Sequence, residues 1–493
     1  MPPAARNLFI KRFLDFQKFF IRVFAIKRIG LIVFVYLIGL SGLFAGERTP
    51  AISGRVKFFT SFFVSDNPDG TFFRHDSGDF SFKRVEARIK VAGRFNNRVS
   101  YNLRFDAFSN SGTVFTGDQF PEAGILGSPL YTEYFEINLY EGNIKVSDFL
   151  VKKLDFTVGK QRIQWGSADK VNVVDVLNPI DFANFFTFDP DYAYERRPQT
   201  ALNFEYYMGM TSKLQFVWLF RHQVAPLPFG YTFLTKNFQA IDDVTVSTSW
   251  GNNIADSNFG LRFSTTILNI DTALYYFKGN SPIPSLYNLT AADKVTAEFL
   301  YPGLQMIAAD ISGELRGVGF WAEAAYFIPE KVTAAALLPI LLNGTSQLME
   351  QKFDLFEKGY YKYVIGADYH FGEGVYANVQ YLRGFFDEAD FSEKSKTFFG
   401  ISTGQFFGEL ESYAIGRLEY SNPAGTLKIG LGGIYEITDK NSFSLTPTLE
   451  FKVADSMLIQ AGGFFNLSGD PKLTKFGMFR DDRIVYVSFK LDF

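Results

Sequence analysis

The feature that most constrains this chain is a two-residue alternation of polar and apolar side chains, which recurs from Ile52 to the C-terminus. Within residues 84–91 the polar members are Arg84, Glu86, Arg88 and Lys90, and an apolar residue follows each of them. Successive side chains of a β-strand point to opposite faces, so each run predicts a strand with one apolar and one polar face. A soluble sandwich and a membrane barrel share this pattern. The connections between the strands have to distinguish the two.

Short and long connections take turns between about eighteen such runs. The predicted strands are 53–65, 80–93, 98–108, 132–142, 153–164, 199–209, 213–223, 258–267, 270–279, 308–316, 318–328, 360–370, 374–384, 406–420, 426–437, 442–453, 457–467 and 481–493. Short turns opposed to long loops are typical of outer-membrane barrels, whose apolar faces meet lipid while their polar faces line the lumen. We therefore predict an all-β fold, a transmembrane antiparallel up-and-down β-barrel of about 18 strands, with about 16 as the lower bound.

Three connections need separate treatment. The connection 143–152 is too long for a tight turn, and 438–441 is too short for an outer loop. In the long connection after residue 328, the apolar segment Ala334–Leu342 suggests a short helix at the surface. The longest irregular connection that carries a recognisable motif is 165–198.

Composition agrees with a barrel and excludes several other classes. The chain has 58 Phe and 25 Tyr, which suits aromatic girdles at the membrane interfaces, although some of these rings are ordinary β-core residues. The net charge of −3 gives no basis for nucleic-acid binding, and the absence of Cys excludes disulfides and thiol chemistry. The three histidines, His75, His222 and His370, lack metal-ligand or triad spacing, so we expect no enzyme, no metal and no cofactor.

The two ends of the chain carry export signals. A basic stretch precedes the apolar run Leu31–Leu40, and small residues follow it, so residues 1–46 are predicted to be a cleaved signal peptide. An uncleaved inner-membrane anchor is the alternative. The final alternating strand ends in Phe493 and resembles the C-terminal signal of bacterial outer-membrane barrels, which the barrel-assembly machinery reads. Residues 47–493 are then one outer-membrane β-barrel.

One motif resembles a known group of proteins. It consists of Gly-Lys-Gln-Arg-Ile-Gln-Trp-Gly at 159–166, Leu-Asn-Pro-Ile-Asp at 177–181 and Glu-Arg-Arg-Pro at 195–198. This pattern resembles that of porin-like outer-membrane barrel families and, more loosely, alginate-export channels. The resemblance implies an outer-membrane channel and no particular solute. In general porins the third outer loop folds inward, so the resemblance implies that 165–198 is an inward-folding loop that constricts the pore.

The loop and the wall beside it supply the predicted pore-lining residues, which carry opposite charges that would face each other across a narrow aqueous gap. They are Arg84, Arg88, Arg104, Asp169, Asp175, Asp181, Asp189, Asp191, Arg196 and Arg197. Trp165, Gly166, Asn178 and Pro179 are expected to shape the loop. The alternative is a solvated outer loop in which Arg196 and Arg197 pair locally with Glu195 or Asp191.

The sequence thus predicts a porin or channel of the bacterial cell outer membrane, through which small hydrophilic or charged solutes diffuse passively. The expected partners are outer-membrane lipid, the barrel-assembly machinery and small solutes, and a homo-oligomer is possible. Two alternatives stay open: a closed structural or adhesive barrel filled by its loops, and a barrel enzyme acting on envelope lipids. In a variant of the channel, Phe182, Phe185, Phe186 and Phe188 form a path for apolar compounds.

Overall fold

The structure is a computed structural model of the whole chain. It describes residues 50–68, 75–111, 133–185, 187–221, 224–226, 243–246, 257–292, 295–342, 345–401, 407–437, 442–467 and 474–493. The predicted signal peptide and His222 lie outside these ranges. None of the helices in the described ranges has the length and apolar character needed to cross a membrane.

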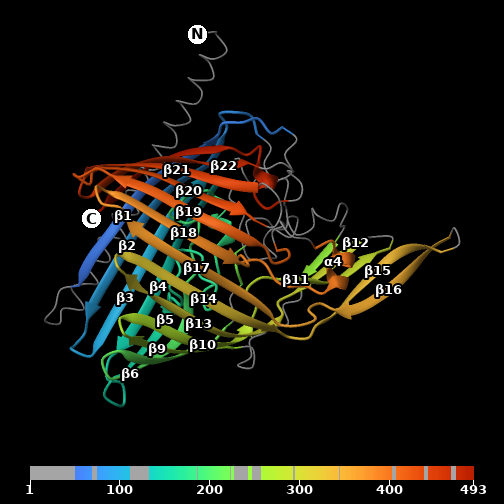
Figure 1. Cartoon of the computed structure of the whole chain (residues 1–493), viewed down its shortest axis with the longest axis horizontal. Coiled ribbons are helices and arrows are strands. Elements are labelled where there is room, and N and C mark those ends of the chain that lie inside the picture. Colours follow the sequence, from blue (N-terminus) through green and yellow to red (C-terminus); the bar gives the residue numbers. More distant parts are fainter. Residues whose placement is uncertain are drawn as a thin grey trace, which may run out of the picture.

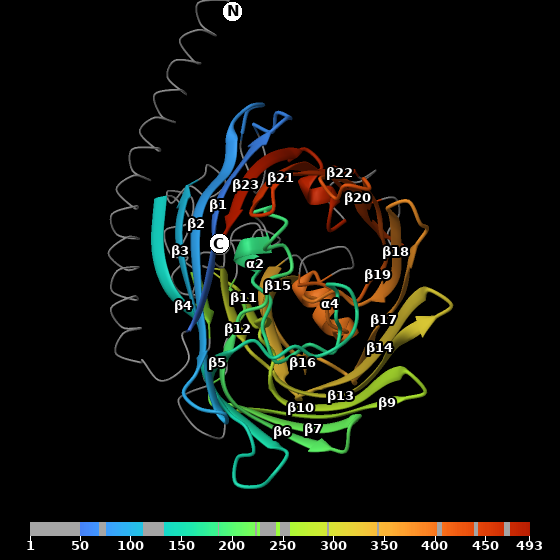
Figure 2. The same cartoon turned by 90° about the vertical axis from the view of Figure 1, so that its left-hand side faces the viewer.

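Eighteen strands close into one antiparallel barrel, in which every strand pairs with its neighbours in chain order and β23 returns to pair with β1 (Figures 1 and 2). They are β1 (Ala51–Phe63), β2 (Phe80–Arg94), β3 (Val99–Ser111), β4 (Glu133–Val146), β5 (Leu154–Gln161), β6 (Gln199–Met208), β7 (Ser212–Leu219), β9 (Asn258–Ile267), β10 (Ile270–Asn280), β13 (Gly303–Leu315), β14 (Val318–Pro329), β17 (Tyr360–His370), β18 (Val375–Arg383), β19 (Ser412–Ser421), β20 (Leu427–Glu436), β21 (Ser442–Ala454), β22 (Met457–Leu467) and β23 (Ile484–Asp492). The predicted fold class and strand number are confirmed.

Alternation along each strand separates a lipid-facing surface from the lumen. In β10, Leu274 is 61% exposed, whereas its neighbours Ala273 and Tyr275 are buried. In β13, Ile307 is 55% exposed and Met306 is fully buried. Exposed apolar side chains recur in the same way around the barrel, as expected for strands whose outer face meets acyl chains. The buried residues face the lumen, where other segments of the chain cover them.

The connection predicted at 143–152 is too long for a tight turn because β4 is longer than the sequence pattern indicated. β4 continues to Val146, and its pairing with β3 shifts by one residue at Arg104 and Phe105, which marks a β-bulge. Only residues 147–153 remain as the turn before β5. The sequence pattern obscured the second half of β4 because a bulge changes which face each following residue occupies.

A second, five-stranded sheet projects from the end of the barrel that carries the long connections (Figure 1). It contains β8 (Asp243–Val246), β11 (Ser285–Ala291), β12 (Val295–Leu300), β15 (Thr333–Leu342) and β16 (Thr345–Asp354), in the order β16-β15-β11-β12-β8. The predicted helix at Ala334–Leu342 is wrong, because this segment is β15 and pairs with β16 along its whole length. The helix α4 (Glu393–Phe399) packs against β15 and β16.

The barrel closes where the first and last strands meet. β1 and β23 pair from Arg55 with Asp492 to Phe63 with Ile484. The backbone of Phe493 exchanges two hydrogen bonds with Gly54, of 2.7 and 3.0 Å, while the Phe493 side chain is 57% exposed. The terminal residue therefore belongs to the closing seam and presents its ring on the outer surface. Its role as an assembly signal stays a prediction.

Candidate functional site

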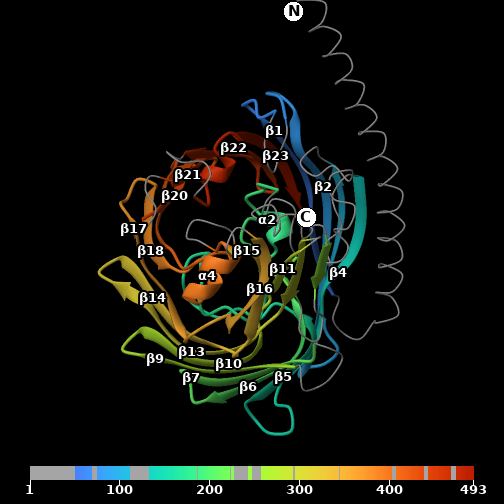
Figure 3. The same cartoon turned by 90° about the vertical axis from the view of Figure 1, so that its right-hand side faces the viewer.

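The candidate site is the connection between β5 and β6, which runs through the inside of the barrel instead of over its rim. The views along the barrel show it within the ring of strands, together with the short helix α2 (Phe182–Phe185) (Figures 2 and 3). We call residues 162–198 the lumen loop. Most of its described side chains are buried, although a surface connection would be largely exposed.

The loop turns inward at Trp165 and Gly166, the residues that the sequence assigned to shaping it. Trp165 is fully buried and donates from Nε1 to Gln215 Oε1 of β7 at 3.0 Å. Its ring occupies the space over Gly260 of β9, where a Cβ atom would lie 2.7 Å from the indole. Gly166 has φ +84°, and a Cβ there would lie 2.4 Å from Glu323 Oε1. Only glycine fits this turn.

Glu323 of β14 fixes the first part of the loop. Its buried carboxylate accepts hydrogen bonds from the backbone N–H groups of Ser167 and Ala168, both at 2.7 Å, and of Val173 at 2.8 Å. Asn172 Nδ2 donates to it as well, at 3.1 Å. A buried carboxylate is stable only when it is hydrogen-bonded or paired, so this arrangement holds the loop and the carboxylate together.

Asp169 attaches the loop to the wall formed by β18 and β19. Its carboxylate lies 3.2 Å from Arg417 Nη2, and its backbone carbonyl accepts from Gln380 Nε2 at 3.1 Å. The next residue, Lys170, has φ +67°, which is unusual for a side chain larger than glycine. Its ammonium lies 5.9 Å from the ring centroid of Tyr194. Among the described residues no carboxylate forms an ion pair with Lys170. Burial and the neighbouring Arg417 lower the pKa of Lys170.

On the opposite side the loop is held by the seam of the barrel. Lys57 of β1 lies 2.5 Å from Asp189 and 2.7 Å from Asp191, and Lys490 of β23 lies 2.7 Å from the other oxygen of Asp191. The side chains of Lys57 and Asp189 are fully buried. Burial alone would raise the pKa of Asp191, but Lys57 and Lys490 outweigh it and hold this pKa well below its usual range. The lumen loop therefore spans the barrel from one wall to the other.

The predicted arginines of the wall lie in direct contact with acids and do not face them across a water-filled gap. Arg88 pairs with Asp106 at 3.0 Å, and Arg104 pairs with the same carboxylate at 2.7 Å. Arg84 is buried; it donates to Asn184 Oδ1 of the loop at 2.6 Å and lies 3.7 Å from Asp189. These groups form one buried network between β2, β3 and the loop.

The predicted charges within the loop hold its own backbone. Arg196 is 9% exposed and donates to the carbonyls of Asp175 at 2.5 Å and Asn172 at 3.1 Å. Arg197 pairs with Asp181 at 2.6 Å. The alternative partners predicted from sequence, Glu195 and Asp191, are not the ones found: Arg196 pairs with Asp175 at 3.5 Å and Arg197 with Asp181.

The remaining loop-shaping residues act at its base. Asn178 accepts from the N–H of Ile163 at 3.1 Å and donates to the carbonyl of Arg197 at 2.7 Å. The carbonyl of Pro179 accepts from the N–H of Arg197 at 2.8 Å. These hydrogen bonds join the first and last segments of the lumen loop to its middle at Asn178 and Pro179.

Two cavities flank the loop and share part of their lining. A cavity of about 340 Å³, which we call the passage, lies between the loop and the wall of β18 to β23. A cavity of about 560 Å³, the vestibule, extends towards the short-turn end, near Asp368 and Tyr376. Both are bordered by Asp169, Lys170, Tyr194 and Arg417. Of the ten residues predicted to line the pore, Asp169 and Asp191 border the passage, and Arg196 borders the vestibule.

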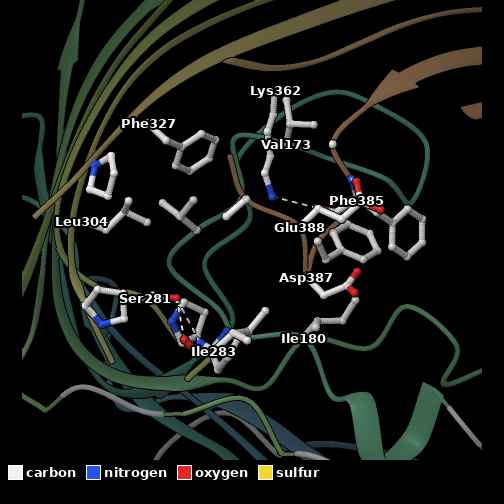
Figure 4. Close-up of a pocket in the computed structure, with 18 of the residues that line it drawn as sticks. Val173, Ile180, Ser281, Ile283, Leu304, Phe327, Lys362, Phe385, Asp387 and Glu388 are labelled. Atoms are coloured by element: carbon white, nitrogen blue, oxygen red, sulfur yellow. Dashed lines mark hydrogen bonds between the residues drawn. The ribbon is translucent and has the colours of Figure 1, made fainter. Parts of the chain in front are cut away.

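A third, smaller pocket of about 120 Å³ lies on the other side of the loop, between Val173 and the wall residues Leu304 and Phe327 (Figure 4). Lys362 of β17 points into it and donates to the carbonyl of Phe385 at 2.7 Å. Glu388 and Asp387 lie next to it and both pair with Lys475, at 2.6 and 3.0 Å. These contacts join the outer connections to each other above the loop.

Sequence reasoning missed Lys170, Glu323 and Arg417. Glu323 and Arg417 are inward-facing charges in strands, a signal that the alternation does carry, but nothing local shows which of many such residues the loop reaches. Lys170 stands directly beside the predicted Asp169. Phe186 lies outside the described residues. Within the described ranges, no group of three or more His, Asp or Glu side chains is placed to hold a metal ion.

Comparison with family models places the chain in a family. Residues 139–430 match the model described as "Protein of unknown function (DUF1302)", which is more than half of the 493 residues. The chain belongs to the DUF1302 family. In this DUF1302 protein the matched range begins within β4, contains the whole lumen loop and ends within β20. No curated protein matches the chain.

Solved structures similar to this DUF1302 protein include an outer-membrane protein. The outer membrane protein OpdK from Pseudomonas aeruginosa has 9% sequence identity and a TM-score of 0.44, with 90% of this chain and 99% of that chain covered. OccAB3 from Acinetobacter baumannii has 11% identity and a TM-score of 0.46, with 90% and 99% covered. OccK9 (OpdG) from Pseudomonas aeruginosa has 8% identity and a TM-score of 0.45, with 90% and 96% covered.

Proposed function

We propose that this DUF1302 protein is a passive channel of the bacterial outer membrane for small hydrophilic or charged solutes, and that the lumen loop sets the width of its pore. The closed barrel with an exposed apolar surface supports insertion into a membrane. The observation that carries the proposal is that the passage and the vestibule share four lining residues, Asp169, Lys170, Tyr194 and Arg417. A route for solutes along one side of the loop would run through both cavities, past these four shared residues.

The composition of the passage supports a route for solutes. On the wall side, Gly430 and Gly432 of β20 face Thr446 and Thr448 of β21, so this stretch of the wall presents small side chains to the passage. A Cβ on either glycine would lie 2.5 Å from the neighbouring Thr Oγ1. On the loop side the same space is bordered by Lys170 and by aromatic rings. A water-filled gap between fixed charges and small side chains suits diffusion of small polar solutes.

The experiment that tests the proposal uses the absence of native cysteine. Lys428 of β20 borders the passage, and a Lys428→Cys variant can be modified with a bulky sulfonated methanethiosulfonate reagent. Purified protein in planar bilayers should show discrete conductance steps that fall after modification. An Asp455→Cys variant, in a fully exposed turn, is the matched control and should keep its conductance. Silence at all voltages would reject a channel.

A closed structural or adhesive barrel predicts a different result in liposomes. An open channel swells liposomes that carry it when small solutes enter, and a barrel filled by its loops does not. The second alternative is an enzyme acting on lipids, which needs a catalytic base. His75 hydrogen-bonds to Asp482 at 2.9 Å and stacks on Phe63. We assign no catalytic residue.

A further inference from the structure

We propose that the lipid-facing surface of β18 to β21 binds one molecule of lipopolysaccharide through its lipid A, with Arg383 contacting a phosphate and a hollow over Gly416 and Gly433 receiving an acyl chain. The site lies on the outer face of the barrel, on the other side of the wall from the passage. It requires insertion into the outer membrane and is independent of whether the barrel conducts.

The first support is the hollow itself, which lies in a stretch of wall where β18 to β21 run side by side (Figure 1). Gly416 of β19 lies opposite Gly433 of β20, so two adjacent positions on the outer face carry no side chain. Val379 stands beside this pair on β18, and Leu445 stands beside it on β21. The hollow has a volume of about 360 Å³, and its other outward-facing lining residues are Ala414, Tyr435 and Phe443. Its outer lining is therefore almost entirely apolar.

The glycine at position 416 is not required by the fold. Its φ is not positive, and a Cβ atom there would first meet the carbonyl oxygen of Asn378, at 3.8 Å, which is ordinary van der Waals contact. Glycine within a strand weakens the strand and often marks a place that a ligand approaches closely. Because the surface around it faces acyl chains, the group that enters the space over Gly416 is an acyl chain.

The second support is a cation at the end of β18 beside the hollow. Arg383 is the last residue of β18 and lies opposite Ser412, the first residue of β19, to which its Nη1 donates at 3.2 Å. Within the described ranges Arg383 forms no ion pair with a carboxylate. A guanidinium group binds phosphate oxygens through parallel hydrogen bonds, so Arg383 suits an anionic headgroup.

Neighbouring rings indicate that Arg383 lies at the level of the headgroups. Tyr381 donates to Ser412 Oγ at 3.0 Å, and its ring stacks on Tyr363 with 5.9 Å between the centroids. Tyrosine is enriched at membrane–water interfaces. Arg383 precedes a long connection, and the short turns lie at the opposite end of the barrel, so this interface is the outer one. The outer leaflet there consists of lipopolysaccharide, whose lipid A carries both phosphates and acyl chains.

One lipid spans the two contact points. Ser412 and Gly416 lie on the same face of β19 and are four residues apart, which is roughly 13 Å along the strand. This is less than the depth of one leaflet, which is half of a hydrocarbon core roughly 30 Å thick. Ala414 lies between them and presents only a methyl group. A phosphate held at Arg383 therefore directs a chain of the same lipid along β19 into the hollow.

The test adds bisphosphorylated lipid A to purified, delipidated protein in detergent and counts the bound lipids by native mass spectrometry. Wild type should bind one lipid A more tightly than it binds phosphatidylethanolamine or dephosphorylated lipid A. Arg383→Gln should weaken this binding about tenfold, as expected for loss of one charge-assisted contact, and Arg383→Lys should retain part of it. Gly416→Leu fills the hollow and should weaken the binding of lipid A as well.

Two matched controls keep the result specific to this surface. Lys278→Gln removes an exposed cation from β10, and Ala324→Leu adds a leucine at an exposed position of β14; both should bind lipid A as wild type does. Equal binding by Arg383→Gln and Lys278→Gln, or by Gly416→Leu and Ala324→Leu, refutes the site. So does equal affinity of wild type for lipid A and phosphatidylethanolamine. An oligomer that Gly416→Leu converts to monomers would show that a second copy fills the hollow, which also refutes the lipid site.

Discussion

Asp191 of the lumen loop bridges the two strands that close the barrel, with one carboxylate oxygen 2.7 Å from Lys57 of β1 and the other 2.7 Å from Lys490 of β23. The edge of the passage near Phe188 depends on this bridge, because Asp191 and Phe188 both border it.

Removing the negative charge at this bridge should loosen the loop. In Asp191→Asn, Lys490 loses its partner and Lys57 keeps only Asp189, so we expect a wider passage and a higher, noisier single-channel conductance. The lost charge-assisted bonds amount to about 2–5 kcal/mol of loop docking. Asp155→Asn, which disturbs a pair with Lys145 at 2.7 Å near the short turns, is the control. Identical conductance in wild type and Asp191→Asn would place the loop edge outside the conducting path.

The same bridge should fail in acid. The folded pKa of Asp191 is held below its ordinary value, so its contribution is fully present above the unfolded pKa and is lost as pH falls through the folded pKa. Loop release should therefore begin only in strong acid, well below pH 4, the ordinary range of a carboxyl. Conductance noise recorded from pH 7 downwards checks this, and Asp191→Asn should show no such transition.

Glu323 should matter more for the loop than its single charge suggests. Glu323→Ala leaves the N–H groups of Ser167, Ala168 and Val173 without their acceptor inside the barrel, at a cost of about 3 kcal/mol or more. Glu323→Gln keeps one acceptor oxygen and should cost less. Limited proteolysis in detergent measures cleavage within residues 166–176. Glu314→Gln, exposed at the end of β13, should behave as wild type; equal protection of the loop in Glu323→Ala would refute this role.

The two adjacent arginines at the end of the loop should differ sharply when replaced. Arg196 is buried and donates to the loop carbonyls of Asp175, Asn178 and Asn172, whereas the side chain of Arg197 is 30% exposed and pairs with Asp181. Arg196→Ala should therefore release the loop and raise conductance, while Arg197→Ala changes it little. Hydrogen exchange of the loop amides should likewise be faster in Arg196→Ala than in Arg197→Ala. A shift of ion selectivity without increased exchange would instead indicate that Arg196 acts as a pore charge.

The outer connections should respond to pH near neutrality. Burial raises the pKa of Glu409 to about 7, although Lys396 at 3.3 Å opposes the shift. A raised carboxyl pKa stabilises the folded connection below the unfolded value of about 4.5, and this contribution is lost as pH rises through about 7. The exchange protection factor at Phe391, whose N–H donates to Glu409, should fall between pH 5 and roughly 8 once the intrinsic pH dependence of amide exchange is divided out. Glu409→Gln should remove that dependence; an unchanged profile in the variant would exclude Glu409 as its source.

The barrel could be predicted from sequence because its signal is local. Each strand carries its own alternation, and all eighteen predicted runs coincide with barrel strands apart from shifts at their ends. The segment Ala334–Leu342 failed because a continuous apolar run suits a helix and a strand equally. Its pairing with Thr345–Asp354 decided between them, and that pairing is not visible in the run itself.

The candidate site was predicted in part. Trp165 and Gly166 belong to a local motif, and the inward course of the loop was implied by the resemblance to general porins, whereas the residues that receive the loop lie far away in sequence. Glu323 is separated from Ser167 by 156 residues, and Lys490 from Asp191 by 299. Which wall residues meet the loop depends on the circumference of the closed barrel. The predicted gap between Arg88 and the acids was wrong in detail because Asp106 stands directly opposite Arg88 in the β2–β3 register.

The bridge at Asp191 also orders the events by which the protein is made. One of its two lysines lies in the first strand to emerge and the other in the last, so the full docking place does not exist until the ring is complete. A nascent sheet open at one edge can hold the loop by Lys57 alone. We therefore expect the loop to dock fully only late in biogenesis, after β1 and β23 have paired and closed the barrel.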